Sequence, residues 1–353
     1  MSGTPPPTLR RLGERVDVRL GALLATERER WSTFDSDLAR PIDEIARLVL
    51  AGGKRLRPAF CHWGYVGAGG GDDDQIDIDA GSALELMHAF ALFHDDVMDD
   101  AATRRGQPTT HALSAAEHAT AGWADESRRF GDGVAILVGD LAFVYADQLM
   151  EAAPVEAVRL WNELRIELNI GQYLDIVGSV QRERRIEKAE RICRYKSGKY
   201  TIERPLHLGA LLADPSRAGE LLPQLSAYGL PLGDAFQMRD DVMGAFGDAT
   251  ATGKPVGGDL IEGKPTPLMA RSVAHADAAQ RAVLDLVGDP DLSAADVARI
   301  QQTIVDTGGL DELEAQITEL ATRAVAAIEA ADITHVAKRE LVALAEYVTV
   351  RTT

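Results

Sequence analysis

The sequence predicts an all-α protein built as one large helical unit. Stretches of helical periodicity alternate with short polar breaks along the 353 residues, whereas alternating β-branched segments, which would indicate strands, are scarce. Apolar residues make up 46% of the chain, enough for a sizeable core. We therefore expect a disordered N-terminal segment over residues 1–8 and a single domain over residues 9–353.

The helices are assigned in chain order from apolar periodicity and from the residues that end them. Gly52-Gly53 ends one helix as a C-terminal glycine cap. Asp214-Pro215 and Gly288-Asp289-Pro290 are clear turns, and the helix around Pro231 is expected to bend or split there. The expected helices cover residues 8–31, 41–51, 57–66, 79–99, 110–121, 132–152, 155–179, 186–197, 200–213, 216–245, 267–287, 293–307, 310–331 and 333–347. The segment 247–263 is the longest without a helical pattern, and loops of that length inside a compact domain are usually functional.

Composition excludes several classes of function. The net charge of -18 argues against nucleic acid or an anionic membrane surface as the main partner. The longest apolar stretch, 84–93, is interrupted by Glu85 and His88 and is far shorter than the roughly 20 residues of a transmembrane helix. Cys61 and Cys193 lack the spacing of metal ligands and fit buried thiols in a reducing compartment. With no secretion signal at the N-terminus, we expect a soluble, cytoplasmic protein.

Two aspartate clusters each lie near the end of an apolar, helical run. The first is Asp95-Asp96-Val97-Met98-Asp99 and the second is Asp240-Asp241-Val242-Met243-Gly244. Residues four apart share one face of a helix, so Asp95 and Asp99 point together. Closely packed carboxylates repel one another unless cations lie among them. Oxygen ligands of this kind suit Mg²⁺ completed by water and phosphate oxygens, so the sequence predicts one magnesium site shared by both clusters.

The alternative is that such clusters are merely solvated acidic surfaces, which are common in a chain this acidic. The run Asp72-Asp73-Asp74 follows a glycine-rich segment and is assigned to an exposed loop of that kind. The first cluster differs, because the preceding segment 84–93 is apolar nearly all round, as in a buried helix.

Basic residues lie next to both clusters and in one further turn. Lys54, Arg55 and Arg57 follow Gly52-Gly53, in a turn that can present cations to a diphosphate or simply be a surface turn. The remaining cations are Arg104 and Arg105 after the first cluster, Lys196 and Lys199, and Lys254 and Lys264 beside the long loop. Of these, Lys199 is expected to face solvent. The arrangement suggests two anion sites, one bridged by metal and one bound by side chains alone.

These motifs resemble those of the trans-isoprenyl diphosphate synthases, also called polyprenyl synthetases. The resemblance runs from about Pro41 to Arg351 and keeps the family's order and spacing. The matching positions are Gly52 to Pro58, His88 seven residues before Asp95, the first aspartate cluster, Arg104-Arg105-Gly106, Gly139-Asp140, Gln172 with Asp175, Lys196-Ser197-Gly198, Phe236-Gln237, Asp240-Asp241, Gly253-Lys254, Asp259-Leu260, Lys264 and Tyr347.

The resemblance implies a helical bundle around a central cavity, a homodimer, and transfer of an allylic group from its diphosphate to isopentenyl diphosphate. It implies several Mg²⁺ ions held by Asp95, Asp96, Asp99, Asp240 and Asp241. The implied catalytic residues are Asp95, Asp96, Lys196, Gln237 and Asp240. Arg104, Lys196 and Lys254 would hold the allylic diphosphate, Lys54, Arg57, His88 and Arg105 would hold isopentenyl diphosphate, and Thr201, Phe236, Gln237 and Lys264 would complete the substrate site.

Taken singly, some of these residues have structural interpretations. His88 fits a buried core histidine, Gln172 with Asp175 fits a hydrogen-bonded supporting pair, and Tyr347 fits helix packing. The second cluster also departs from the family's fuller pattern, because Gly244 stands where a third aspartate is expected. Asp241 and Asp248 are the candidates to compensate.

Residues before the first cluster bear on product length. Ala91 and Met87 lie one and two turns before Asp95, about 6 and 12 Å along the helix, and Phe90 is the bulky residue five positions before it. In the family, bulky residues here stop chain growth, and this arrangement resembles the C20 group, so we expect geranylgeranyl diphosphate. The alternatives are a farnesyl or longer-chain synthase, a terpene cyclase, which has no need of the second diphosphate site, and a non-catalytic synthase subunit.

Overall fold

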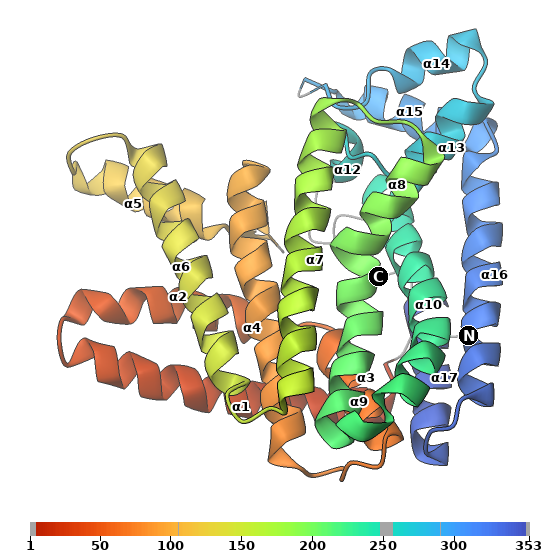
Figure 1. Cartoon of the computed structure of the whole chain (residues 1–353). Helices are drawn as coiled ribbons and strands as arrows, with labels where there is room; N and C mark the ends of the chain where they lie inside the picture. The colour runs from red at the N-terminus through yellow and green to blue at the C-terminus, as the bar shows by residue number, and fades with distance from the viewer. Residues whose placement is uncertain (1–4, 105, 248–256, 290, 351–353) are drawn as a thin grey trace. The chain divides into compact units, whose positions relative to one another are not determined.

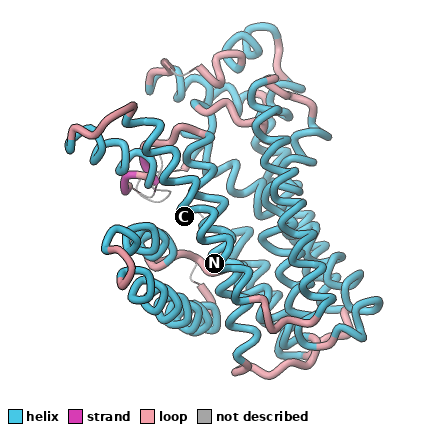
Figure 2. The backbone as a smooth tube through the Cα atoms, turned by 60° about the vertical axis from the view of Figure 1, so that its left-hand side comes forward, coloured by secondary structure: helices cyan, strands magenta, loops and turns pink. Residues whose placement is uncertain are grey.

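The computed structural model of the chain describes residues 5–104, 106–247, 257–289 and 291–350, which are mostly helical (Figures 1 and 2). The prediction of an all-α protein is confirmed. Among these residues, the sheet consists of one short antiparallel pair, β1 (Thr103–Arg104) and β2 (Gln107–Pro108). Of the helices in the described ranges, none has both the length and the apolar character that crossing a membrane requires.

Backbone contacts group the chain into two compact units. The N-terminal unit consists of Pro7–His62 and Gly71–Pro154, and the C-terminal unit consists mainly of Trp63–Gly70 and Val155–Thr353. Helix α3 (Leu56–Gly67) contributes residues to both. The prediction of one domain over residues 9–353 stays a prediction. Helix α1 starts at Pro7, so Pro7 and Thr8 are helical rather than part of a disordered segment.

The N-terminal unit is organised around α4 (Gln75–Met98). Its other elements are α1 (Pro7–Ser32), η1 (Ser36–Leu38), α2 (Ala39–Val49), α5 (Thr110–Ala121) and α6 (Ser127–Leu149). Helix α4 packs against α6, α1 and α2. Leu84, Leu86 and Met87 are fully buried on it, as expected for a helix that is apolar on most of its circumference. Burial of α4 fixes the direction in which its end carries the first aspartate cluster.

The C-terminal unit is organised around the long helix α10 (Ala218–Phe246), which packs against α16 and against η2, a π-helix over Arg194–Glu203. The other elements are α7 (Val155–Val180), α8 (Ile186–Cys193), α9 (Arg204–Ala213), η3 (Pro215–Arg217), α12 (Gly258–Ile261), α13 (Pro267–His275), α14 (Ala278–Leu284), α15 (Ala294–Asp306), α16 (Gly309–Ala330) and α17 (His335–Val350). The core beside the second aspartate cluster contains Met238, Leu268, Ile300 and Leu313.

Several helix ends lie a few residues from the predicted ones, and α12 lies inside the segment 247–263 that was predicted to have no helix. Three further differences change how the helices divide. The expected break between residues 197 and 200 is absent, because the chain continues there as the π-helix η2. Helix α10 is not split at Pro231, which lies within it. The predicted helix 267–287 is divided, because Asp277 starts α14 with a capping box: its side chain accepts from the Gln280 N–H, and the Gln280 side chain accepts from the Asp277 N–H.

Candidate functional site

The first aspartate cluster forms the C-terminal end of α4. Asp96 is buried, with 5% of its surface exposed, and Asp95 and Asp99 are half-buried. Asp99 is the C-cap residue, and its N–H donates to the Asp95 carbonyl at 2.8 Å. The structure thus brings the three predicted metal ligands of the first cluster to one helix end within the N-terminal unit.

Arg104 lies against this cluster. Its Nε donates to Asp96 Oδ1 at 2.8 Å, its Nη2 lies 2.6 Å from the same oxygen, and Nη2 is 3.7 Å from Asp95 Oδ2. Burial raises the pKa of Asp96, although Arg104 opposes that shift. A partly buried carboxylate cluster with one arginine is suited to bind cations and an anionic group together. Arg105, which was predicted to bind isopentenyl diphosphate, lies outside the described residues.

The basic residues at the start of α3 differ in burial and therefore in role. Arg55 is buried, and its guanidinium donates to Glu85 on α4, to Asp17 on α1 at 2.5 Å, and to the Val49 carbonyl. It is therefore an anchor for the turn. Lys54 and Arg57, which flank this anchor, are half-buried. His88, predicted to bind the same diphosphate, is also half-buried and lies on α4, one turn after Glu85.

The second cluster lies near the C-terminal end of α10. Asp240 is half-buried, and Asp241 is 4% exposed. Gln237, one turn earlier, donates from Nε2 to Asp241 Oδ1 at 2.9 Å, while Asp241 Oδ2 is buried with no hydrogen-bond partner among the described residues. Burial raises the pKa of Asp241 well above its usual value, and the charges of Asp259, Asp240 and Asp175 add to the rise. Such a carboxylate needs a positive partner to ionise.

The π-helix η2 of the C-terminal unit carries two further predicted substrate-site residues, Lys196 and Thr201. Lys196 Nζ lies 2.5 Å from Asp175 Oδ2 on α7, which agrees with a supporting role for Asp175. Thr201 is 1% exposed, and Phe236 on α10 is 7% exposed.

Lys264 Nζ lies 2.5 Å from Glu262 and 3.6 Å from Asp259. Lys254 and Asp248 lie outside the described residues, so their predicted roles are not tested.

Gly244, the departure in the second cluster, faces Asp259. A Cβ built on Gly244 would lie 1.8 Å from Asp259 Oδ2 and 2.4 Å from its Cγ. The carboxylate of Asp259, which comes from α12, therefore fills the space next to position 244. Asp259 was predicted only as part of a motif, because its local sequence pattern does not show which helix it packs on.

We predict that Gly244→Asp lowers the free energy of unfolding by about 1–3 kcal/mol, the usual cost of overpacking, because the new side chain displaces Asp259. Asp259→Ala in the same chain should restore most of the loss. Urea unfolding of both variants measures this. A Gly244→Asp protein as stable as the parent chain would contradict the packing seen here.

The residues expected to set product length lie along α4. Met87 is fully buried, while Phe90 and Ala91 are half-buried. The Phe90 ring packs on Phe143 of α6, with ring centroids 4.5 Å apart, and edge-on to His94 at 4.6 Å. Phe143 was missed by the sequence analysis, since it lies 53 positions from Phe90 and becomes its neighbour only through the packing of α6 on α4.

The two aspartate clusters belong to different units, so their sharing one metal site stays a prediction. Within the described ranges, no three His, Cys, Asp or Glu side chains are already grouped as a metal site.

Tyr347 is half-buried in α17, and Gln172 is half-buried on α7.

Comparison with known proteins decides the family. A family model described as polyprenyl synthetase matches residues 39–304. The chain belongs to the polyprenyl synthetase family. It is therefore a trans-prenyltransferase, as the resemblance of its motifs implied.

Individual relatives of this polyprenyl synthetase differ in the product for which they are named. The geranylfarnesyl diphosphate synthase of Aeropyrum pernix is 32% identical over 278 residues, covering 76% of this chain and 80% of the relative. The geranylgeranyl diphosphate synthase of Mycobacterium tuberculosis is 32% identical over 302 residues, covering 84% and 79%. A crystal structure of geranylgeranyl pyrophosphate synthase from Corynebacterium glutamicum, complexed with isoprenyl diphosphate and magnesium, is 34% identical, with a TM-score of 0.91 over 97% of this chain and 99% of that one.

Proposed function

We propose that the chain condenses isopentenyl diphosphate with an allylic diphosphate in a Mg²⁺-dependent reaction, and that its main product is geranylgeranyl diphosphate. The observation that carries the proposal is the carboxylate cluster at the end of α4, in which Asp96 is buried and paired with Arg104. A cluster of this kind is costly without a cation, and it belongs to a chain of the polyprenyl synthetase family.

The donor set fits Mg²⁺. Asp95, Asp96 and Asp99 offer only oxygen ligands, and in the second cluster the buried Asp241 Oδ2 has no hydrogen-bond partner among the described residues. Mg²⁺ keeps several waters and takes further ligands from substrate phosphates, so it does not require a complete protein cage. Bound Mg²⁺ supplies positive charge that stabilises a departing diphosphate. We assign it to Asp95, Asp96, Asp99, Asp240 and Asp241.

The chain's own side chains bind and orient the two substrates. Arg104, Lys196 and Lys254 hold the allylic diphosphate, so that its carbon–oxygen bond breaks with the negative charge stabilised by these cations. Lys54, Arg57, His88 and Arg105 hold isopentenyl diphosphate, whose double bond attacks the allylic carbon. A proton is then lost to the departing diphosphate, and no side-chain nucleophile is needed. Thr201, Phe236, Gln237 and Lys264 complete the substrate site.

The test is an assay of the purified chain alone, with Mg²⁺, labelled isopentenyl diphosphate and dimethylallyl, geranyl or farnesyl diphosphate as starter. We expect isopentenyl diphosphate to be consumed and C20 product to predominate. Consumption of allylic diphosphate without isopentenyl diphosphate, the result expected of a cyclase, would overturn the proposed reaction. Consumption of neither substrate, the result expected of a non-catalytic subunit, would overturn it as well. Mostly C15 or mostly C30 and longer products would overturn the assigned chain length.

Product length provides a prediction at Phe90. Removing its ring opens space next to Phe143 of α6, so Phe90→Ala should shift the main product from C20 to C25 or longer. Chromatography of the dephosphorylated products measures the shift. Phe34→Ala is the control, because Phe34 is an exposed aromatic residue of the same unit. An unchanged product from Phe90→Ala would show that Phe90 does not stop chain growth.

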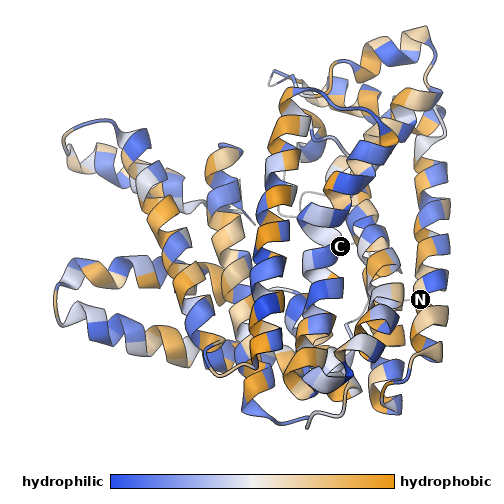
Figure 3. Ribbon diagram, viewed as in Figure 1, coloured by the Kyte–Doolittle hydropathy of each residue, from blue (hydrophilic) through white to orange (hydrophobic). Residues whose placement is uncertain are grey.

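We also propose a homodimer. On α7 the residues Ile166, Ile170, Tyr173 and Val180 are exposed at helical spacing, and on α6 Leu137 and Val144 are exposed. Figure 3 shows apolar positions recurring along both helices. Exposed apolar patches of this kind usually mark interaction surfaces. Sedimentation equilibrium should give twice the chain mass, and Tyr173→Asp should shift the mass toward that of one chain. A parent protein that sediments as a monomer at micromolar concentration would contradict the proposal.

A further inference from the structure

The π-helix η2 is the most unusual backbone segment of the C-terminal unit. Its ten residues, Arg194–Glu203, carry both Lys196 and Thr201. π-Helical turns are rare, since their hydrogen bonding is less favourable than that of an α-helix, and they are found mainly at functional sites. Such a segment keeps its geometry only when surrounding contacts fix it.

One face of α7 supplies contacts to this π-helix. Glu167, Gly171 and Asp175 are spaced by four residues and so share that face. A Cβ on Gly171 would lie 2.5 Å from the Lys196 backbone nitrogen, so the two backbones approach closely there. Asp175 pairs with the Lys196 side chain.

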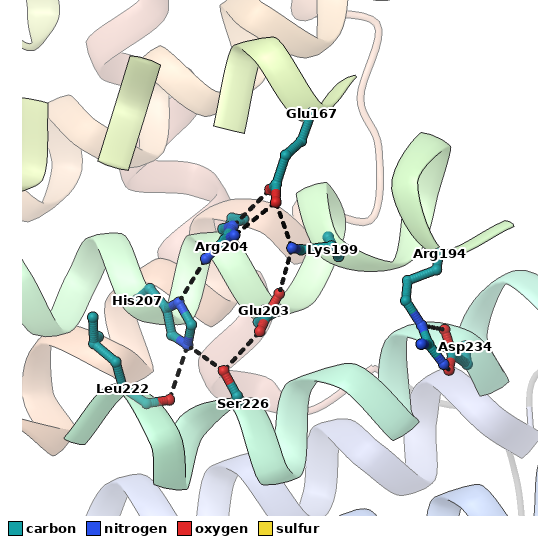
Figure 4. A network of polar contacts seen from close by, with 9 residues as sticks. All are labelled: Glu167, Arg194, Lys199, Glu203, Arg204, His207, Leu222, Ser226 and Asp234. Atoms are coloured by element: carbon teal, nitrogen blue, oxygen red, sulfur yellow. Dashed lines mark hydrogen bonds and ion pairs between the residues drawn. The ribbon is translucent and has the colours of Figure 1, made fainter. Parts of the chain in front are cut away.

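Glu167, one turn earlier on α7, accepts from two cations. Lys199 of the π-helix donates to its Oε1, and Arg204 at the start of α9 donates through Nε and Nη2 at 2.7 Å each (Figure 4). The Lys199 side chain is 13% exposed, so the expectation that it faces solvent is wrong. Burial alone would raise the pKa of Glu167, but Arg204 and Lys199 hold it below its usual value, so Glu167 is ionised.

The network continues to α10. Lys199 Nζ lies 3.8 Å from Glu203, and Glu203 accepts from the Ser226 hydroxyl at 2.7 Å. Arg204 Nη1 lies 3.3 Å from His207 Nδ1, which must accept because arginine only donates. His207 Nε2 then carries the proton and lies 3.0 Å from Ser226. Burial and the charge of Arg204 lower the pKa of His207 to about 3, so two carboxylates balance two cations.

We infer that this buried ion network, centred on Glu167, holds the π-helix in the geometry from which Lys196 and Thr201 meet the substrate. Glu167 is thus a positioning residue that acts through Lys196 and touches no substrate itself. The inference rests on the proposed function, because it assigns the network to the allylic side of that reaction.

The test compares Glu167→Gln and Lys199→Met with the parent chain. Lys199→Met removes the tie to the π-helix but leaves Glu167 paired with Arg204, so it remains informative if Glu167→Gln folds poorly. We expect kcat/KM for the allylic diphosphate to fall by about 10–100-fold, with the KM for isopentenyl diphosphate changed less than about twofold. Hydrogen exchange over residues 194–203 should quicken. Glu220→Gln, which alters an exposed pair with Arg217 in the same unit, is the matched control.

A double-mutant cycle separates positioning from general support. In a Lys196→Ala background, Glu167→Gln should have less than about a twofold further effect on kcat/KM, because both changes act through one side chain. Full additivity, or a Glu167→Gln enzyme with parent kinetics and parent exchange, would overturn the inference. An inactive parent chain would instead refute the proposed function, so the two failures are distinguishable.

Discussion

Asp96→Asn should lower kcat by about 1,000-fold or more, since electrostatic stabilisation of a leaving group is the largest single contribution in reactions of this type. Asparagine keeps the shape of the side chain and removes its charge. In the structure that charge lies beside Asp95 and is paired with Arg104. The loss should also weaken Mg²⁺ binding, so that saturating the remaining activity requires more metal.

The control for this prediction is Asp79→Asn. Asp79 also lies on α4 and also pairs with an arginine, Arg19, at 2.5 Å, but near the other end of the helix. Its replacement should leave kcat within about twofold of the parent value, because this half-buried pair has no proposed contact with metal or substrate and such pairs contribute little. Steady-state kinetics at several Mg²⁺ concentrations measure both variants. Equal losses in the two would mean that Asp96 supports the fold and not the chemistry.

Lys196→Ala should lower kcat/KM for the allylic diphosphate by roughly 100-fold, the scale expected when one partner of a close charge pair is removed. Two effects combine in this loss. The ammonium that is proposed to hold the leaving diphosphate disappears, and Asp175, which lies 2.5 Å from it and is buried, is left with an uncompensated charge.

Lys188→Ala is the matched control for Lys196. The Lys188 side chain is 24% exposed against 22% for Lys196, and it pairs with Glu183 at 3.1 Å in the same unit. It carries no proposed contact with substrate, so its replacement should change kcat/KM less than about threefold. A parent-like Lys196→Ala enzyme would remove Lys196 from the substrate site.

The sequence was a good guide to features that depend on local pattern. Apolar runs and turn residues predicted most helices, and the spacing of Asp95, Asp96 and Asp99 predicted a shared helix end. The buried helix before that cluster was predicted from residues 84–93 alone, because a helix that is apolar nearly all round has to be covered. The Gly52-Gly53 stop likewise marked the turn that presents Lys54 and Arg57.

Features that depend on packing between distant segments were not predictable in the same way. Arg55 was predicted only as one of three cations in the turn, and its pairing with Glu85 and Asp17 depends on how α4 and α1 pack there. The filling of space beside Gly244 by Asp259 depends on how α12 meets α10. The π-helix was predicted as a break around Gly198, because its ties to Glu167 and Asp175 on α7 join segments that are far apart in the sequence.

The most direct measurement is a crystal structure of the chain with Mg²⁺, isopentenyl diphosphate and an unreactive thio analogue of farnesyl diphosphate. We predict Mg²⁺ ions that join the analogue's diphosphate to Asp95 and Asp99 on one side and to Asp240 on the other, with isopentenyl diphosphate bound by Lys54 and Arg57. Metal bound at only one cluster, or a diphosphate bound away from both, would contradict the proposed chemistry.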